Sequence, residues 1–132
     1  LGANSEAEKR PNGPIGLKDT YGLDVDFSPI EDSGGAVTVR ALKDNSVNMA
    51  IMYTASPSIS DNGFVELEDP KNLLLASHVV PLASSSISPE AEEIINTVSA
   101  SMTPEDLVEL NRRSVTDKQS AKVIAADWLA EN

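Results

Sequence analysis

The side chains best placed to do chemistry form a short polar run, Tyr53 to Ser56, directly after an apolar segment. The residues from Val47 to Tyr53 are apolar enough to predict a strand covered on both faces. Because open α/β sheets build ligand crevices at the carboxyl ends of their strands, Tyr53 and Thr54 are expected to line a binding site. A desolvated cation held over the Tyr53 ring would gain about 2 kcal/mol. The competing interpretation is a tyrosine buried in the core.

Two other segments could bind an anion. Arg10 stands in a turn with Pro11 and Gly13, where its guanidinium could hold a carboxylate in bidentate geometry. The alternative is a loop arginine that is merely solvated. The run from Asp32 to Gly35 could hold an anion through the amides of a helix N-terminus, but the same residues suit a plain helix cap, and we favour the cap.

The sequence offers little for catalysis or metal binding. His78 is the single histidine and there is no cysteine, so a metal site would have to combine His78 with carboxylates alone. A Ser-His-Asp triad is allowed by composition, but no Gly-x-Ser-x-Gly sequence, phosphate-binding glycine loop or His-Glu-x-x-His pair is present. We therefore expect no enzyme activity, no metal and no cofactor.

The chain is strongly acidic. Its 132 residues include 21 acidic and 10 basic side chains, which give a formal net charge of -11. That charge would repel nucleic acid and anionic membrane surfaces, so nucleic-acid binding is disfavoured. No apolar run approaches the roughly 20 residues of a membrane-spanning helix. Since the first residue is Leu1 and not Met, we expect a processed or truncated chain.

The elements that would position the polar residues alternate between helix and strand. Pro14 to Tyr21 can form a short helix that ends at Gly22 in the left-handed conformation. A second helix follows Gly35, with Val37 and Ala41 turned toward a sheet. Strands are expected over residues 23–28, 47–53, 64–67 and 73–82. Strands separated by helices predict an α/β fold with a largely parallel sheet.

Three more helices are expected toward the C-terminus. They start at Ser88, Thr103 and Thr116, whose hydroxyls can cap a helix. Apolar side chains at helical spacing predict that each helix buries one face in a core. These side chains are Ala91, Ile94, Ile95 and Val98, then Leu107, Val108 and Leu110, and finally Val123, Ile124, Trp128 and Leu129.

Four segments of the chain carry a resemblance to a known family. They are LGANSEAEKRPNGPIGLKDTYGL, DSGGAVTVRALKDNSVNMAIMYTASPSI, FVELEDPKNLLLASHVVPL and MTPEDLVELNRRSVTDKQSAKVIAADWLAEN. In order and spacing they resemble the substrate-binding proteins of ABC importers for quaternary ammonium osmoprotectants, the glycine betaine/carnitine/choline-binding family.

The resemblance implies a partial type II periplasmic-binding-protein fold, in which ligand lies in a cleft between two lobes. Residues 1–77 would form most of the second lobe. Residues 78–132 would form a crossing strand that returns to the first lobe, together with the C-terminal helices of that lobe. The N-terminal half of the first lobe and the start of the second would be absent, so the chain would supply one wall of the cleft.

The resemblance also implies ligand contacts. Tyr53 falls on a position of the family's aromatic cage for trimethylammonium groups, and Arg10 on a position that faces the ligand carboxylate. Thr54 stands beside the cage, where relatives also have a small hydroxyl residue. Ser77 takes a position that is aromatic in many relatives, and His78 follows it. Thr54, Ser77 and His78 are therefore expected as lesser contacts.

These assignments predict a non-enzymatic, extracytoplasmic component of an ABC importer, in the periplasm or on a cell-surface lipoprotein. It would close its lobes on a glycine betaine, choline or carnitine-like quaternary ammonium compound and present it to a membrane permease, without a cofactor. The runner-up is the effector-sensing domain of a transcription regulator with the same fold, and a fragment without activity comes third. Exposed sheet edges would also allow a homodimer or an exchange of elements between two copies.

Overall fold

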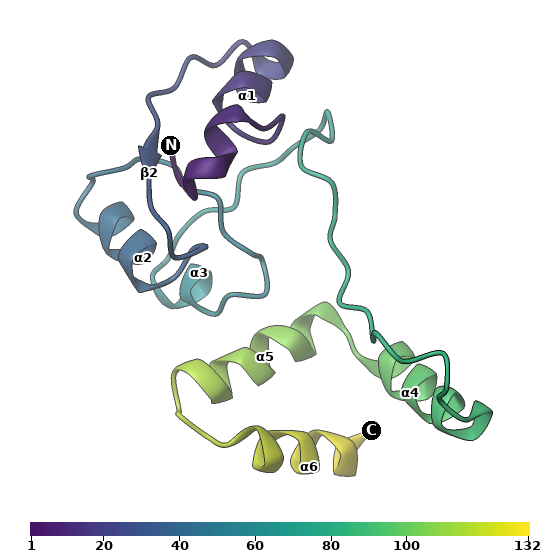
Figure 1. Cartoon of the computed structure of the whole chain (residues 1–132). Helices are drawn as coiled ribbons and strands as arrows, with labels where there is room; N and C mark the ends of the chain where they lie inside the picture. Colours follow the sequence, from purple (N-terminus) through teal and green to yellow (C-terminus); the bar gives the residue numbers. More distant parts are fainter. The chain divides into compact units, whose positions relative to one another are not determined.

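A small parallel sheet starts with the first residues of the chain. The computed structural model describes residues 1–132. Strand β1, Gly2–Ala3, pairs in parallel with β2, Ser28–Pro29, and bridges Ala50 in parallel on its other edge (Figure 1). The extended segments around β2, β1 and Ala50 thus lie side by side and run in the same direction. The α/β class with parallel pairing that the sequence predicts is confirmed.

The strands are much shorter than the sequence predicts. The Leu1 and Ala3 carbonyls accept bonds from the amides of Ser28 and Ile30, at 2.9 and 2.8 Å. The ladder to β1 therefore begins only at the ends of the strands predicted over 23–28 and 47–53, at Ser28 and at Ala50. The strands predicted over 64–67 and 73–82 were wrong, since neither segment pairs with another strand.

Two helical segments follow β1. Helix η1, Ser5–Lys9, is a 3-10 helix, and it packs against α1, Pro14–Tyr21, which has the bounds that the sequence predicts. Gly22 ends α1 at φ 71, in the left-handed region where a side chain would be strained, and its amide bonds back to the Leu17 and Lys18 carbonyls. The predicted glycine stop is therefore confirmed.

Helix α2, Ala36–Lys43, contacts β1, and the short helix α3, Ser58–Asp61, follows further along the chain. The buried side chain of α2 is Thr38, which is 1% exposed, whereas Val37 is 61% exposed. The prediction that Val37 faces the sheet was wrong. The helix is rotated so that Thr38 faces inward, where its hydroxyl bonds to Asp32.

The chain divides into two compact units. The first contains Leu1–Thr54 and Ser58–Ala76, and the second contains Ala55–Pro57 and Ser77–Asn132. This boundary falls close to the division at residue 77 that the sequence analysis proposes between two lobes. The assignment of the units to lobes stays a prediction.

The second unit contains three helices, drawn in green to yellow in Figure 1. They are α4, Pro89–Ser101, α5, Pro104–Val115, and α6, Ala121–Glu131. Ser88 and Thr103 cap α4 and α5 as predicted, but the cap of α6 is Ser120 and not Thr116. Thr116 still has helical dihedral angles at the end of α5, and the chain turns at Lys118, where φ is 58.

The apolar core of the second unit lies between α5 and α6. Ile124 and Trp128 of α6 are buried, as predicted, but Val123 and Leu129 are 49% and 56% exposed, and the predicted stripe of α5 is only half-buried.

The prediction for α4 was wrong, because none of its residues is buried and Ile94 is 66% exposed. No other element of this unit makes an extensive contact with α4, and Ala91, Ile95 and Val98 of its apolar stripe are only half-buried.

Candidate functional site

Polar side chains follow all three extended segments of the parallel sheet, at the edge where the segments end. Asn4 and Ser5 come after β1, Glu31 comes shortly after β2, and Tyr53 and Thr54 come shortly after the segment that bridges β1 at Ala50. Because parallel strands end at the same edge, these residues belong to one side of the first unit. Ligands of open α/β sheets bind at this carboxyl edge.

Hydrogen bonds connect the loops after β1 and β2. The Asn4 side chain donates to Ser33 Oγ at 2.9 Å and accepts from the Ser33 amide at 3.1 Å. The Ser5 amide donates to Glu31 Oε1 at 2.9 Å. Bonds from the Ser5 hydroxyl and amide lower the pKa of Glu31, so this exposed carboxylate stays ionised at neutral pH. The edge therefore carries a fixed negative charge.

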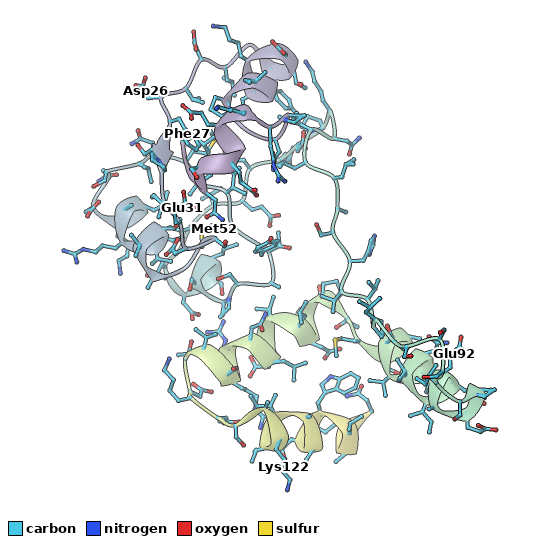
Figure 2. The ribbon with its side chains drawn as sticks, viewed as in Figure 1. Asp26, Phe27, Glu31, Met52, Glu92 and Lys122 are labelled. Carbon is cyan, nitrogen blue, oxygen red and sulfur yellow. The ribbon has the colours of Figure 1, made fainter.

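The loop after β2 also approaches the loop that carries Tyr53. Gly34 has φ 84 and lies against Met52, so a Cβ atom at Gly34 would be 3.1 Å from the Met52 Cα atom. Figure 2 labels Glu31 and Met52, which come from these two loops of the first unit. Only glycine combines this backbone conformation with such a close approach.

Tyr53 is exposed and makes no hydrogen bond, ion pair or ring contact with another residue. Its side chain is 68% exposed, so the alternative of a core tyrosine was wrong. Thr54 beside it is also exposed. The free ring face is available to a ligand, and the cage role of Tyr53 stays a prediction.

The second tyrosine differs from Tyr53, because its partners lie within the protein. The Tyr21 hydroxyl donates to the Asp69 carboxylate, and the Lys71 ammonium lies 5.1 Å from the centre of the Tyr21 ring. Burial, and then the bond to Asp69, raise the pKa of Tyr21. These contacts hold the loop around Asp69 onto the end of α1, and the Lys71 ammonium lies over one face of the Tyr21 ring.

Arg10 follows η1 and forms an exposed ion pair. Its Nη2 atom lies 2.8 Å from Glu6 Oε2, four residues earlier. Both side chains are about 60% exposed, at 59% and 62%. An exposed pair of this kind contributes little stability, so a ligand carboxylate could compete with Glu6 for the guanidinium.

The run from Asp32 to Gly35 is a helix cap. Asp32 accepts bonds from the amides of Val37 and Thr38, at 2.7 and 3.1 Å, and from Thr38 Oγ1 at 2.5 Å. Burial raises the pKa of Asp32, but these bonds outweigh burial, so the pKa lies below its ordinary value. The carboxylate occupies the amides that an anion would need, which supports the cap over an anion site.

Ser77 and His78 belong to the second unit, whereas Arg10, Tyr53 and Thr54 belong to the first. Both are exposed and lie outside helices and strands. The structure shows no hydrogen bond at either side chain. Within the first unit, no hydrogen bond links Arg10 to Tyr53 or Thr54.

Three polar residues of the edge, Asn4, Ser5 and Glu31, were not predicted from the sequence, and Ser33 was predicted only as part of the run from Asp32 to Gly35. The signal that could have found them is their position directly after the extended segments that pair in the sheet. This position was not recognised because the strand predicted over 23–28 ends before the end of β2 at Pro29, and because β1 has only two residues.

Other kinds of site have little support in this structure. No group of three or more His, Cys, Asp or Glu side chains is arranged to hold a metal ion. None of the helices has the length and the apolar composition that crossing a membrane requires. An open hollow along α4 near Glu92, labelled in Figure 2, is lined by that helix alone and contains no predicted site residue.

Comparisons with known proteins agree with one another. The family model OpuAC, described as the substrate binding domain of ABC-type glycine betaine transport system, matches residues 1–131. Among solved structures, the chain is similar to one described as "Crystal structure of glycine betaine/carnitine/choline ABC transporter", with a TM-score of 0.72 and 21% identity. The match covers 99% of this chain and 48% of that one, so the chain spans about half its length. At this identity the likeness shows the fold alone. No curated protein matches the sequence.

Proposed function

This chain belongs to the family of substrate-binding domains of ABC-type glycine betaine transport systems, and from that premise we propose that it binds a quaternary ammonium compound for import. The family is non-enzymatic, and its members serve transport. The ligand we propose carries a trimethylammonium group, as glycine betaine, choline and carnitine do. Tyr53 would form one wall of the aromatic cage, with Thr54 beside it.

The observation that carries the proposal is the exposed ring of Tyr53 at the carboxyl edge of a parallel sheet. This ring has no partner within the protein, unlike the ring of Tyr21. A quaternary ammonium ion cannot donate a hydrogen bond, so an aromatic face and a nearby negative charge are the groups that attract it. The Glu31 carboxylate supplies such a charge on the same edge.

Arg10 would orient ligands that also carry a carboxylate. Its guanidinium is held by Glu6 at 2.8 Å in an exposed pair, and a ligand carboxylate could replace or share that contact. Glycine betaine and carnitine have a carboxylate and choline has none. The contribution of Arg10 should therefore depend on the ligand.

In the complete binding site, this chain would supply one wall of an inter-lobe cleft that closes on the ligand by a hinge motion. The first unit would represent most of one lobe, and the second unit would bring Ser77 and His78 as lesser contacts. The closed form of this extracytoplasmic component would present the ligand to a membrane permease. No cofactor takes part in such a cycle.

Isothermal titration of the full-length protein that contains this chain, with glycine betaine, carnitine and choline, tests the proposal. We expect binding of at least one of them, and a loss of roughly tenfold to 30-fold in affinity for Tyr53→Ala, because cation–π contact is worth about 2 kcal/mol. Tyr53→Phe keeps the ring and should retain most of the affinity. Tyr21→Phe is the matched control at the other tyrosine and should bind as the unaltered protein does.

The Arg10→Met variant distinguishes the contribution of the ligand carboxylate from that of the ammonium group. It should weaken the binding of glycine betaine and carnitine and leave the binding of choline unchanged, because only the first two carry a carboxylate. The absence of heat with all three ligands would contradict the proposed function. Equal losses for Tyr53→Phe and Tyr53→Ala would contradict the cage assignment alone.

A further inference from the structure

The loop that follows Tyr53 leaves the first compact unit for three residues. Ala55–Pro57 belong to the second unit, whereas the residues on both sides of them belong to the first. Pro57 is buried and Ala55 is half-buried, so this short segment packs against protein. The second unit therefore supplies the surroundings of the residues directly after the candidate site.

A side chain of α5 contacts the backbone of this segment. The Asn111 Nδ2 group donates a hydrogen bond to the Ala55 carbonyl at 2.9 Å, although the two residues are 56 positions apart in the sequence. Asn111 is half-buried. Asparagine is a poor helix former, because its side chain competes for backbone groups nearby. Here the side chain instead satisfies the backbone of a distant loop.

Helix α5 can hold this segment because both of its ends are fixed. At its start, Thr103 and Asp106 form a reciprocal capping box. Near its end, Arg113 bonds to Gln119 Oε1 at 2.7 Å and to the Asp127 carboxylate of α6. A helix that is held in this way presents a side chain more precisely than a loop does.

Tyr53 and Thr54 stand between two contacts that fix the backbone of their loop. On one side, Met52 lies so close to Gly34 that a Cβ atom there would be 3.1 Å from the Met52 Cα atom. On the other side, the Ala55 carbonyl accepts the bond from α5. The Tyr53 ring is 68% exposed and makes no hydrogen bond or ring contact of its own. The direction of the ring is therefore set through the backbone at these two points.

We propose that Asn111 is a positioning residue for Tyr53, and that it acts through the Ala55 carbonyl and the backbone between them. The inference rests on the proposed function, in which the Tyr53 ring contacts a trimethylammonium group. A cation–π contact requires the cation to lie over the ring face, so a ring whose direction varies binds the cation less well. Because glycine betaine, carnitine and choline share the ammonium group, Asn111 should affect all three alike. Arg10, in contrast, should affect only ligands with a carboxylate.

Calorimetric titration of the full-length protein that contains this chain tests the role of Asn111. Asn111→Ala removes the donor and places a better helix former in α5, so a loss of affinity would not come from a weaker helix. We expect a loss of about threefold to tenfold for each of the three ligands, which is what one neutral hydrogen bond is worth. Asn96→Ala is the matched control, because it makes the same change at an exposed position of α4 and should leave binding unaltered.

A double variant separates positioning from a general structural role. In the Tyr53→Ala background the ring is absent, so the further change Asn111→Ala should alter the affinity by less than about twofold. Equal losses in the presence and absence of the Tyr53 ring would overturn the proposal. A loss confined to the ligands that carry a carboxylate would overturn it as well.

Amide hydrogen exchange gives a second readout that needs no ligand. The amides of Ala55 and Ser56 should exchange faster in Asn111→Ala than in Asn96→Ala, because only the first variant releases the loop. Equal exchange in the two variants would overturn the proposal whatever the ligand. The absence of heat with all three ligands in the unaltered protein would contradict the proposed function and the ligand role of Asn111 together, and exchange would then still decide whether Asn111 holds the loop.

Discussion

Replacing Asp32 by alanine should strongly destabilise the first unit. Asp32 is a single side chain that satisfies two amides at the start of α2 and the hydroxyl of Thr38. Thr38 is 1% exposed, so water cannot replace the lost acceptor without a rearrangement. The variant therefore removes a helix cap and leaves a buried hydroxyl without its partner.

The two losses can be estimated separately. Loss of a capping side chain costs about 1 kcal/mol, with a range of about 0.5 to 2. A buried polar group left without a partner costs about 1 to 3 kcal/mol. We expect Asp32→Ala to lower the free energy of unfolding by about 2 to 4 kcal/mol. In a Thr38→Val background the buried hydroxyl is absent, so the same change should cost only about 1 kcal/mol.

The effect should also depend on pH in a defined direction. The pKa of Asp32 in the folded protein lies below its ordinary value of 3.8. A carboxyl group with a lowered folded pKa stabilises the fold above its unfolded pKa, and this contribution is lost as the pH falls through the folded pKa. The difference between the unaltered chain and Asp32→Ala should therefore be constant above about pH 5 and shrink below pH 3.8.

Urea unfolding followed by far-ultraviolet circular dichroism measures these free energies, and amide exchange at Val37 and Thr38 reports the cap directly. Both amides should exchange faster in Asp32→Ala. A destabilisation below about 0.5 kcal/mol would refute the reasoning. So would an equal cost of Asp32→Ala in the presence and absence of the Thr38 hydroxyl, because the structure couples these two groups.

Two further predictions concern the second unit. Thr103→Ala removes the capping box with Asp106 and should lower the stability of α5 by about 1 kcal/mol in thermal unfolding, whereas the exposed Ser114→Ala should be nearly neutral. Equal melting temperatures for the two variants would contradict this. Arg113→Met removes the bonds from α5 to Gln119 at 2.7 Å and to the Asp127 carboxylate, and should cost about 1 kcal/mol because the pair is only partly buried. The fluorescence of Trp128, the single tryptophan, should then shift to longer wavelength at a lower urea concentration than in the unaltered chain. An unchanged midpoint of urea unfolding would contradict a stabilising role of the contact.

The family and the parallel α/β class could both be predicted from the sequence, and both are confirmed. Arg10, Tyr53 and Thr54 were proposed from the residues and again through the resemblance, Ser77 and His78 through the resemblance alone, and all five remain proposals. For Tyr53 the structure adds one fact that the sequence could not supply. Exposure of 68% separates a ring available to ligand from a ring buried in a core, and burial depends on what other segments cover the residue.

The sequence by itself determined the features that depend on neighbours within a few residues. The bounds of α1, its stop at Gly22, and the caps at Ser88 and Thr103 all follow from hydrogen bonds between residues three to six positions apart. Such contacts form wherever the local sequence allows them, so local patterns predict them.

Only the tertiary structure decided which predicted strands form a ladder and which helical faces become core. A strand needs a partner from a distant segment, and β1 pairs with residues near β2 and Ala50 but with nothing near residues 73–82. The apolar face of α4 needs a covering element, which the second unit does not supply. Apolar periodicity shows which face can be buried, whereas burial itself requires a second surface at the right place.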